Sequence, residues 1–389
     1  MPLLMILSKE DMSDMKPDKL QAPLRVMKTP RTVDIAITNR CNLRCTYCYH
    51  FSSAGDVDED LPKKEWLRFF EKLKRCAVMD VVLAGGEPFF RKDLCELIEG
   101  IVHNNMRFSI LSNGTLITDK IAEFLSSTER CDYVQVSLDG SKPETHDACR
   151  GNGNFNRAIK GIECLRKHSV SVQVRATIHK HNVTDLEAMA RFLFEGIGLE
   201  SFSTNAASYM GLLRQNVEQV GLTVEDRMLA MKSLVRINKK YNNRINAQAG
   251  PLEEATTWTE MMNARDQGEK QIPGRGHLTA CGCVWDKIAV RADGAIVPCT
   301  MLSHMKLGQI NKDDFKEIWQ DHPGMRKMRV RRNIPLSDFK FCQGCEYINF
   351  CTGNCPGLAY TIVGKVNHPS PDACLKRFLD EGGKLPDTI

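Results

Sequence analysis

Residues 38–49 read TNRCNLRCTYCY, and this stretch decides the fold. Three residues separate Cys41 from Cys45, and two separate Cys45 from Cys48. The stretch directly follows residues 33–37 (VDIAI), a β-branched run typical of a strand. Neighbouring side chains of a strand face opposite ways, so the three thiols can converge only on a loop beyond its end. The spacing therefore predicts a strand followed by a loop that holds one inorganic centre.

Three thiolates in this arrangement suit a [4Fe–4S] cluster, which normally takes four cysteines. Three ligands leave one iron open, and an open metal position serves chemistry, as the contrast between catalytic and structural zinc sites illustrates. Two other interpretations stay open: a zinc site, and three unrelated buried thiols. Zinc would favour a second CX2C pair nearby, and none follows within the next forty residues.

The loop resembles the signature of the radical S-adenosylmethionine (radical SAM) superfamily, in which an aromatic residue, here Tyr47, precedes the last cysteine. The resemblance implies that the amino and carboxylate groups of SAM chelate the open iron. One electron from the cluster would split SAM into methionine and a 5′-deoxyadenosyl radical, which abstracts hydrogen from a substrate. The strand before the loop is the context that this signature requires.

Length and composition indicate an ordinary globular protein. The chain has 389 residues, 42% hydrophobic and 26% charged, enough for a large α/β domain and a smaller module. No apolar run reaches the roughly 20 residues that span a bilayer, and the first residues lack a secretory pattern. The net charge of +5 is too mild to indicate nucleic acid. Sixteen cysteines then favour metal binding over disulfides, in a cytoplasmic and low-oxygen setting.

Strand-like and helix-like patterns alternate from residue 33 and predict an α/β fold, a partial (β/α)6 TIM-like barrel. The expected strands are 33–37, 80–84, 107–111, 133–138, 172–178 and 200–204. The expected helices are 62–77, 91–105, 117–128, 154–168 and 184–195, the last opening with a capping box at 184–187 (TDLE). Such repeats imply right-handed crossovers and a parallel sheet. Chemistry in such folds lies at the carboxyl ends of the strands.

Further signals fall at those ends. Gly85, Gly86 and Glu87 close the second strand, and paired glycines allow close approach to a ligand amine, although a tight turn would use them equally. With the cysteine loop they resemble the family's GGE motif, which holds the SAM amino group. Ser112 and Asn113 end the third strand and resemble a SAM-contacting segment of the peptide-modifying branch.

Two more residues are candidates by the same resemblance. Ser137, at the end of the fourth strand, would bind the SAM ribose or carboxylate. Arg150 matches an arginine that clamps the SAM carboxylate, a group that suits a planar guanidinium, although a solvated arginine is the alternative. The fifth strand is expected to pass the adenine, with Arg175 a weak candidate.

A second field of cysteines follows residue 280. An Asp293-Gly294 turn between two strand-like runs indicates a hairpin that brings Cys281 and Cys283 near Cys299. The later thiols have the spacing CX2CX5CX3C and then one more after eighteen residues: Cys342, Cys345, Cys351, Cys355 and Cys374. A zinc ribbon is the main alternative for these spacings.

This order resembles the SPASM module, which holds two auxiliary [4Fe–4S] clusters in addition to the SAM-binding one. The resemblance assigns the first auxiliary cluster to Cys281 and/or Cys283, with Cys299 and Cys355. It assigns the second to Cys342, Cys345, Cys351 and Cys374. The other cysteines, Cys76, Cys95, Cys131, Cys149 and Cys164, receive no role. The basic run 326–332 (RKMRVRR) is interpreted as a solvated face, with steering of an acidic substrate as the alternative.

These features divide the chain into an N-terminal arm (1–32), the barrel (33–205), a bridging helical region (206–280, with a helix near 223–241), the SPASM module (281–375) and a tail (376–389). The resemblance implies a peptide or protein maturase that installs a crosslink or an oxidation, the auxiliary clusters accepting the product's electron. An electron donor such as flavodoxin or ferredoxin is expected. Only 32 residues precede the first strand, so a leader peptide would need a separate binding protein or be absent.

One maturase activity is disfavoured, and two other functions, a tetrapyrrole-modifying enzyme and an electron carrier, stay open. Thr300 follows Cys299 where sulfatase maturases carry a catalytic Asp, which argues against that activity. The stretch 133–150 resembles haem-pathway members of the family about as well, so a tetrapyrrole is the alternative substrate. An electron carrier that uses all three clusters is the remaining alternative, from outside the enzymes. It is disfavoured because a carrier has no need of a cluster with an open iron.

Overall fold

A computed structural model of the chain describes residues 26–51, 59–279 and 281–386. Most of the expected N-terminal arm lies outside these residues. Within them, none of the helices is both long and apolar enough to cross a bilayer.

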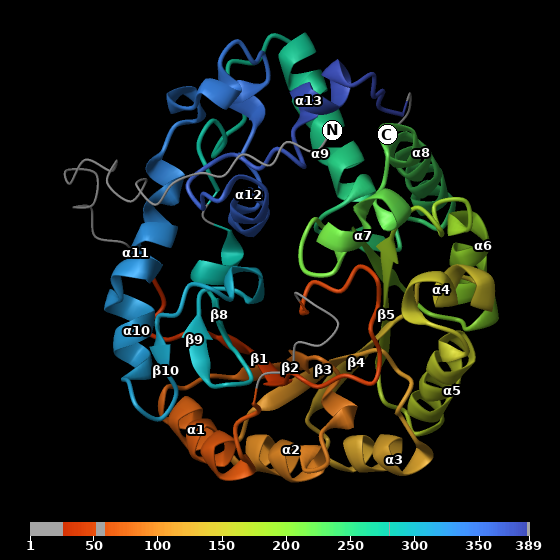
Figure 1. The fold of residues 1–389 in the computed structure, drawn as a ribbon, viewed down its shortest axis with the longest axis vertical. Helices are drawn as coiled ribbons and strands as arrows, with labels where there is room; N and C mark the ends of the chain where they lie inside the picture. Colours follow the sequence, from red (N-terminus) through yellow and green to blue (C-terminus); the bar gives the residue numbers. More distant parts are fainter. Residues whose placement is uncertain (1–25, 52–58, 280, 387–389) are drawn as a thin grey trace.

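The fold is built on a mixed, mostly parallel sheet surrounded by helices, as the sequence predicts (Figure 1). In the described part of the chain the sheet has ten strands in the order β10-β9-β8-β1-β2-β3-β4-β5-β6-β7. The strands are β1 (Thr32–Thr38), β2 (Asp80–Gly85), β3 (Arg107–Ser112), β4 (Cys131–Ser137), β5 (Val172–Ile178), β6 (Phe202–Ala206), β7 (Ile245–Ala247), β8 (Lys287–Val290), β9 (Ala295–Val297) and β10 (Gly308–Gln309).

The helices in the described residues are α1 (Lys63–Arg75), α2 (Leu94–His103), α3 (Asp119–Ser127), α4 (Pro143–Arg150), α5 (Asn154–Lys167), α6 (Leu186–Arg191), α7 (Leu213–Val220), α8 (Val224–Lys240), α9 (Pro251–Asp266), α10 (Phe315–Asp321), α11 (Pro323–Val330), α12 (Pro356–Val363) and α13 (Leu375–Asp380). Helices such as α1, α2, α3 and α5 pack their apolar residues against one face of the sheet in the main core, while others, such as α13, belong to a second core. A π-helical turn, Phe192–Gly196, extends α6.

Successive side chains of each strand point to opposite faces of the sheet, one toward the helices and one toward the barrel interior. Val33, Ile35 and Ile37 of β1 are fully buried in the main core, whereas the residues between them face the barrel interior. Trp66 and Phe70 of α1 pack in the same core. A helix with one apolar stripe covers a sheet in this way.

The hairpin of the second cysteine field continues the barrel sheet. Strand β8 pairs in parallel with β1, from Thr32 opposite Lys287 to Ile35 opposite Val290. Strand β9 then turns back antiparallel to β8, as the Asp-Gly turn predicts. Cys299 therefore follows a strand that runs antiparallel to β1, and the residue after it, Thr300, contacts Tyr49 of the first cysteine loop.

The expected capping box at residues 184–187 is wrong. Helix α6 begins at Leu186, and its N-cap residue, Asp185, makes no capping hydrogen bond. The Asp185 carboxylate instead accepts hydrogen bonds from Ser141 and Thr145, each at 2.7 Å. The Asp185 side chain therefore makes contacts with Ser141 and Thr145 instead of capping the helix.

The bridging region holds more structure than its polar pattern indicates. The helix expected near 223–241 is α8, which has a true capping box at Thr223 and Asp226. The stretch after it contains β7 and the 16-residue helix α9. Helix α9 contributes to the main core through Leu252 and to a second core through Trp258, so its buried residues do not form one stripe.

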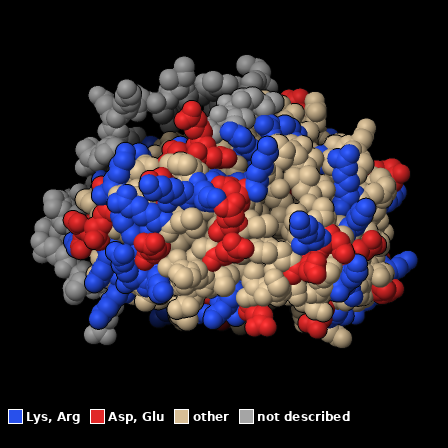
Figure 2. All heavy atoms as spheres, turned by 90° about the horizontal axis from the view of Figure 1, so that it is seen from below, with Lys and Arg blue, Asp and Glu red and all other residues tan. Residues whose placement is uncertain are grey.

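The solvated interpretation of the basic run 326–332 is also wrong in part. Arg326 and Arg332 are exposed, but Arg329 and Arg331 are 1% and 0% exposed. They are buried because α11 and the turn after it pack their inner side against the cysteine-rich module. On the face that carries α1, α2 and α3, basic and acidic side chains are interspersed, with the basic ones most crowded to one side (Figure 2).

Candidate active site

The first cysteine loop is tied by backbone hydrogen bonds to the residues that follow β2 and to α4. Backbone bonds join Gly86 to Thr38 and Glu87 to Arg40, both at 2.8 Å. On its other side, Thr46 N–H donates to the Cys149 carbonyl of α4 at 3.0 Å. The loop is therefore held on both sides by backbone contacts.

The two glycines permit this close approach. A Cβ at Gly85 would come within 2.2 Å of the Thr38 carbonyl oxygen, and one at Gly86 equally close to that of Arg40. Gly85 also has φ +126°, which favours glycine. The pair fixes the distance between the end of β2 and the cysteine loop.

The thiols of Cys41, Cys45 and Cys48 are half-buried and interact electrostatically with one another. Burial raises the pKa of Cys41 to about 11 and that of Cys45 to about 12. Metal binding to this loop must therefore release protons, and metal affinity rises with pH. The amide of Asn113, at the end of β3, lies 3.8 Å from the Cys41 sulfur.

Glu87 is fully buried and bonded inside the protein. Its carboxylate accepts hydrogen bonds from Ser112 Oγ at 2.9 Å, from Asn113 N–H at 2.7 Å and from Phe89 N–H at 3.1 Å. Burial raises the Glu87 pKa to about 7. The Glu87 side chain thus joins the end of β2 to the end of β3, while its backbone N–H donates to Arg40 of the cysteine loop.

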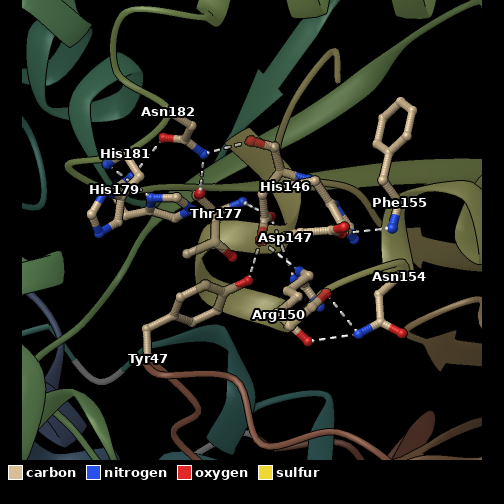
Figure 3. Close-up of polar contacts among 12 residues, drawn as sticks. Tyr47, His146, Asp147, Arg150, Asn154, Phe155, Thr177, His179, His181 and Asn182 are labelled. Atoms are coloured by element: carbon tan, nitrogen blue, oxygen red, sulfur yellow. Dashed lines mark hydrogen bonds and ion pairs between the residues drawn. The ribbon is translucent and has the colours of Figure 1, made fainter. Parts of the chain in front are cut away.

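The centre of the polar network is Asp139, two residues beyond β4. Its carboxylate accepts from the Tyr47 hydroxyl, from Arg150 Nε at 2.5 Å and from Thr177 N–H at 2.9 Å. Tyr47, Arg150 and Thr177 converge in Figure 3 from the cysteine loop, α4 and β5. Burial alone would raise the Asp139 pKa, but Arg150 and neighbouring histidines lower it to about 2.

Arg150 is thus a buried ion-pair partner rather than a solvated arginine. Its side chain is 7% exposed. Its guanidinium carbon lies 5.4 Å from the centre of the Tyr47 ring, and Tyr47 lies between two of the loop cysteines. Ser137, half-buried at the end of β4, stands opposite Arg175 of β5.

Two histidines flank this network and are held neutral. Burial lowers the pKa of both His146 and His179 to about 4. His146 Nδ1 accepts from Asp139 N–H at 3.1 Å, and His179 Nδ1 accepts from His181 N–H at 3.2 Å. The His179 ring lies 5.6 Å from that of Tyr47. Both Nε2 atoms are buried without a hydrogen-bond partner in the structure.

The interactions among the thiols of the second cysteine field fall into two groups, as the resemblance to the SPASM module implies. In the first, Cys283 hydrogen-bonds to both Cys281 and Cys299, and Cys355 interacts electrostatically with Cys281 and Cys299. The hydrogen bonds from Cys283 lower the pKa values of the other two thiols and raise its own.

In the second group, burial and then the thiols of Cys351, Cys345 and Cys374 raise the pKa of Cys342 to about 12. Within the described ranges, no three Cys, His, Asp or Glu side chains are arranged to hold a single metal ion. An iron–sulfur cluster is larger than one ion and takes its thiolates over a wider spacing, so both groups fit it in ligand number and kind.

A cavity of about 360 Å³ separates the first cysteine loop from the second field. Its lining includes Ala36, Gly85, Tyr49, Phe51, Val297 and Thr300. The Tyr49 hydroxyl hydrogen-bonds to the Thr300 side chain, so the residue after Cys48 meets the residue after Cys299.

The sequence reasoning missed Asp139, His146 and His179. Of residues 137–140 (SLDG) at the end of β4, the sequence analysis predicts a role for Ser137 alone. An acid two residues past a strand end, on the catalytic side of a barrel, was the available signal. The histidines carry no spacing pattern that could have identified them. Arg175, a weak candidate, donates to Ser203 Oγ at 3.2 Å on the inner face.

Comparison with known proteins places this geometry in a family. The model of the radical SAM superfamily matches residues 35–193, and that of the SPASM iron–sulfur cluster-binding domain matches residues 281–346. Fe-coproporphyrin III synthase of Methanosarcina barkeri is 28% identical over 87% of this chain and 86% of its own. PqqA peptide cyclase of Ruegeria pomeroyi is 22% identical over 88% and 87%.

Among solved structures, SuiB of Streptococcus suis bound to its precursor peptide SuiA has the same fold. The TM-score is 0.64 at 17% sequence identity, covering 90% of this chain and 77% of that one. The two matched domains bind iron–sulfur clusters, the first together with SAM. The chain therefore has a radical SAM domain followed by a SPASM iron–sulfur cluster-binding domain, and it is an enzyme.

Proposed function

We propose that the chain is a maturase that removes hydrogen from a side chain of a peptide or protein and so leads to a crosslink or an oxidation. Cys41, Cys45 and Cys48 would hold the SAM-binding cluster. When bound, that cluster and SAM supply the hydrogen-abstracting radical. The residues proposed around SAM are Tyr47, Gly85, Gly86, Glu87, Ser112, Asn113, Ser137 and Arg150.

Two further clusters complete the proposed set of three. The first would be held by Cys281 and/or Cys283, with Cys299 and Cys355, and the second by Cys342, Cys345, Cys351 and Cys374. The cytoplasm, with a flavodoxin or ferredoxin as electron donor and a separate leader-binding protein, is the proposed setting.

The cavity that Tyr49 and Thr300 line is the observation that supports the peptide assignment. Its volume of about 360 Å³ lies at the low end of the roughly 300–1,000 Å³ of small-molecule pockets. One amino-acid side chain fits such a space, whereas a tetrapyrrole with its carboxylate arms needs more. The relative named PqqA peptide cyclase and the SuiB–SuiA complex are consistent with a peptide.

A tetrapyrrole is the second candidate, and one observation favours it. Fe-coproporphyrin III synthase is 28% identical to this chain, against 22% for the peptide cyclase, at nearly equal coverage. A tetrapyrrole substrate would require the cavity lined by Tyr49 and Thr300 to enlarge.

The test is a direct competition between the two substrate classes. Anaerobically reconstituted protein receives SAM, dithionite and either short peptides encoded beside its gene or a set of porphyrins and related tetrapyrroles that includes precursors of Fe-coproporphyrin III as well as that compound itself. Mass spectrometry follows both pools. We expect a peptide to change mass by loss of hydrogen while the tetrapyrroles stay intact. Turnover of a tetrapyrrole with every peptide unchanged would contradict the proposal.

A further inference from the structure

Arg331 belongs to the basic run 326–332 but is completely buried. It begins the short turn Arg331–Asn333 that directly follows α11, and its exposed fraction is 0%. A fully buried arginine normally has a carboxylate partner. Within the described residues, no carboxylate forms an ion pair with Arg331.

The guanidinium is held by backbone carbonyls on two of its nitrogens. One terminal nitrogen donates to the Thr279 carbonyl, and the other to the His368 carbonyl at 3.5 Å. Thr279 in turn accepts, through its hydroxyl, from Cys281 N–H at 3.0 Å. Arg331 therefore braces the segment that presents Cys281.

The remaining donor has no partner in the structure. Arg331 Nε is buried and makes no hydrogen bond. The charged groups that interact with this guanidinium are the thiols of Cys355, Cys281 and Cys283. An unpaired buried cation is costly, and deprotonated cysteines are the anions within its reach.

We propose that Arg331 is a positioning residue for the first auxiliary cluster, offsetting the negative charge of its cysteine sulfurs and donating to one of them through Nε. The inference rests on the proposed cluster at Cys281, Cys283, Cys299 and Cys355. Hydrogen bonds to sulfur and the net charge nearby set the reduction potential of such a cluster. Arg331 stabilises the more negative, reduced state and so raises that potential.

Arg329, two residues earlier, offers a matched control. It is 1% exposed, donates from Nε to the Val284 carbonyl at 2.9 Å and lies 4.6 Å from the Trp319 ring. Its charged neighbours are Arg326 and Asp321 rather than thiols. Replacing either arginine removes a buried cation, but only Arg331 has thiols among the charged groups that act on its guanidinium.

The experiment is a potentiometric titration of the reconstituted holoenzyme followed by electron paramagnetic resonance, for wild type, Arg331→Gln, Arg331→Lys and Arg329→Gln. We expect Arg331→Gln to lower the reduction potential of one cluster. At a fixed solution potential the ratio of reduced to oxidised cluster should fall at least tenfold, which corresponds to about 59 mV for a one-electron couple. Arg331→Lys, which keeps the charge, should retain most of the potential. Arg329→Gln should shift none, and the other clusters serve as internal references.

Iron and sulfide contents separate the possible failures. A wild type that holds only the SAM-binding cluster overturns both the auxiliary assignment and this role. Fully loaded Arg331→Gln with unchanged potentials, or with the shift seen in Arg329→Gln, overturns the role of Arg331 alone. If Arg331→Gln loses one cluster, its recovery in Arg331→Lys supports the role. The same loss in both Arg331 variants and in Arg329→Gln indicates a merely structural arginine and overturns it.

Discussion

Asp139 decides the local geometry because it is the shared acceptor of three separate elements. Its carboxylate receives Tyr47 from the cysteine loop, Arg150 from α4 and the backbone of Thr177 from β5. Both members of the Asp139–Arg150 ion pair are buried, with side-chain exposures of 0% and 7%. A buried ion pair of this kind contributes little when intact, but removing one partner leaves an uncompensated charge.

Asp139→Asn should therefore destabilise the protein strongly. The amide keeps the shape but leaves Arg150 without its anion, and the expected loss is about 3–5 kcal/mol of unfolding free energy. Anaerobic urea unfolding followed by circular dichroism measures it. Asp119→Asn, at an exposed pair with Lys167, is the control and should leave the midpoint unchanged. Equal midpoints for the two variants would argue against the role of Asp139.

Stability should also fall as the pH is lowered, because two histidines are buried neutral. The pKa values of His146 and His179 are near 4 in the folded chain, against about 6.5 unfolded. Between those values the unfolded chain binds protons that the folded chain refuses, so unfolding becomes easier as pH falls from about 6.5 to 4.

His146→Asn should flatten that dependence. The asparagine oxygen can accept from Asp139 N–H in place of Nδ1, while nothing at the position titrates. We expect the slope of unfolding free energy to decrease by up to about 1.4 kcal/mol per pH unit, measured by urea titrations from pH 7 to 4. His103→Asn, at an exposed site on α2, should keep the wild-type slope. A wild-type slope in both variants would mean that His146 is protonated in the fold.

At the level of elements, the sequence predicted the barrel strands well and the polar helices poorly. Strands β1 to β6 fall within two residues of the expected ranges because their buried faces impose β-branched runs. Helix α4 was missed because its sequence, PETHDACR, buries Thr145, His146 and Arg150 in the polar network instead of an apolar stripe. Helix α9 was missed because it packs against two cores.

Helix α9 should prove to be the joint between the barrel and the C-terminal module. Trp258 is 2% exposed, and its ring lies 5.0 Å from that of Phe378 in α13. Trp258→Ala should cost about 3–5 kcal/mol of unfolding free energy by leaving a cavity. Urea unfolding measures the loss. Leu229→Ala on α8, where the side chain is 42% exposed, should change it by about 0.5 kcal/mol or less. Similar losses in both would place the joint elsewhere.

At the level of the whole molecule, one sheet unites the two cysteine fields. The pairing of β8 with β1 brings Thr300 to Tyr49, although about 250 residues separate them in the sequence. The resemblance to the SPASM module, which the cysteine spacing carries, predicts the membership of each thiol group. Long-range contacts of Asp139 and Arg331 could not be predicted, because nothing local in the sequence specifies a partner across the fold.

The central claim is that Cys41, Cys45 and Cys48 hold a cluster that binds SAM, and reductive SAM cleavage tests it most directly. Anaerobic, iron-loaded protein given SAM and dithionite should release 5′-deoxyadenosine, detected by liquid chromatography. Cys48→Ala should abolish the release, whereas Cys95→Ala, at an exposed thiol on α2, should retain it. Fully loaded wild-type protein that releases no 5′-deoxyadenosine, or Cys48→Ala protein that releases as much as wild type, would contradict the claim.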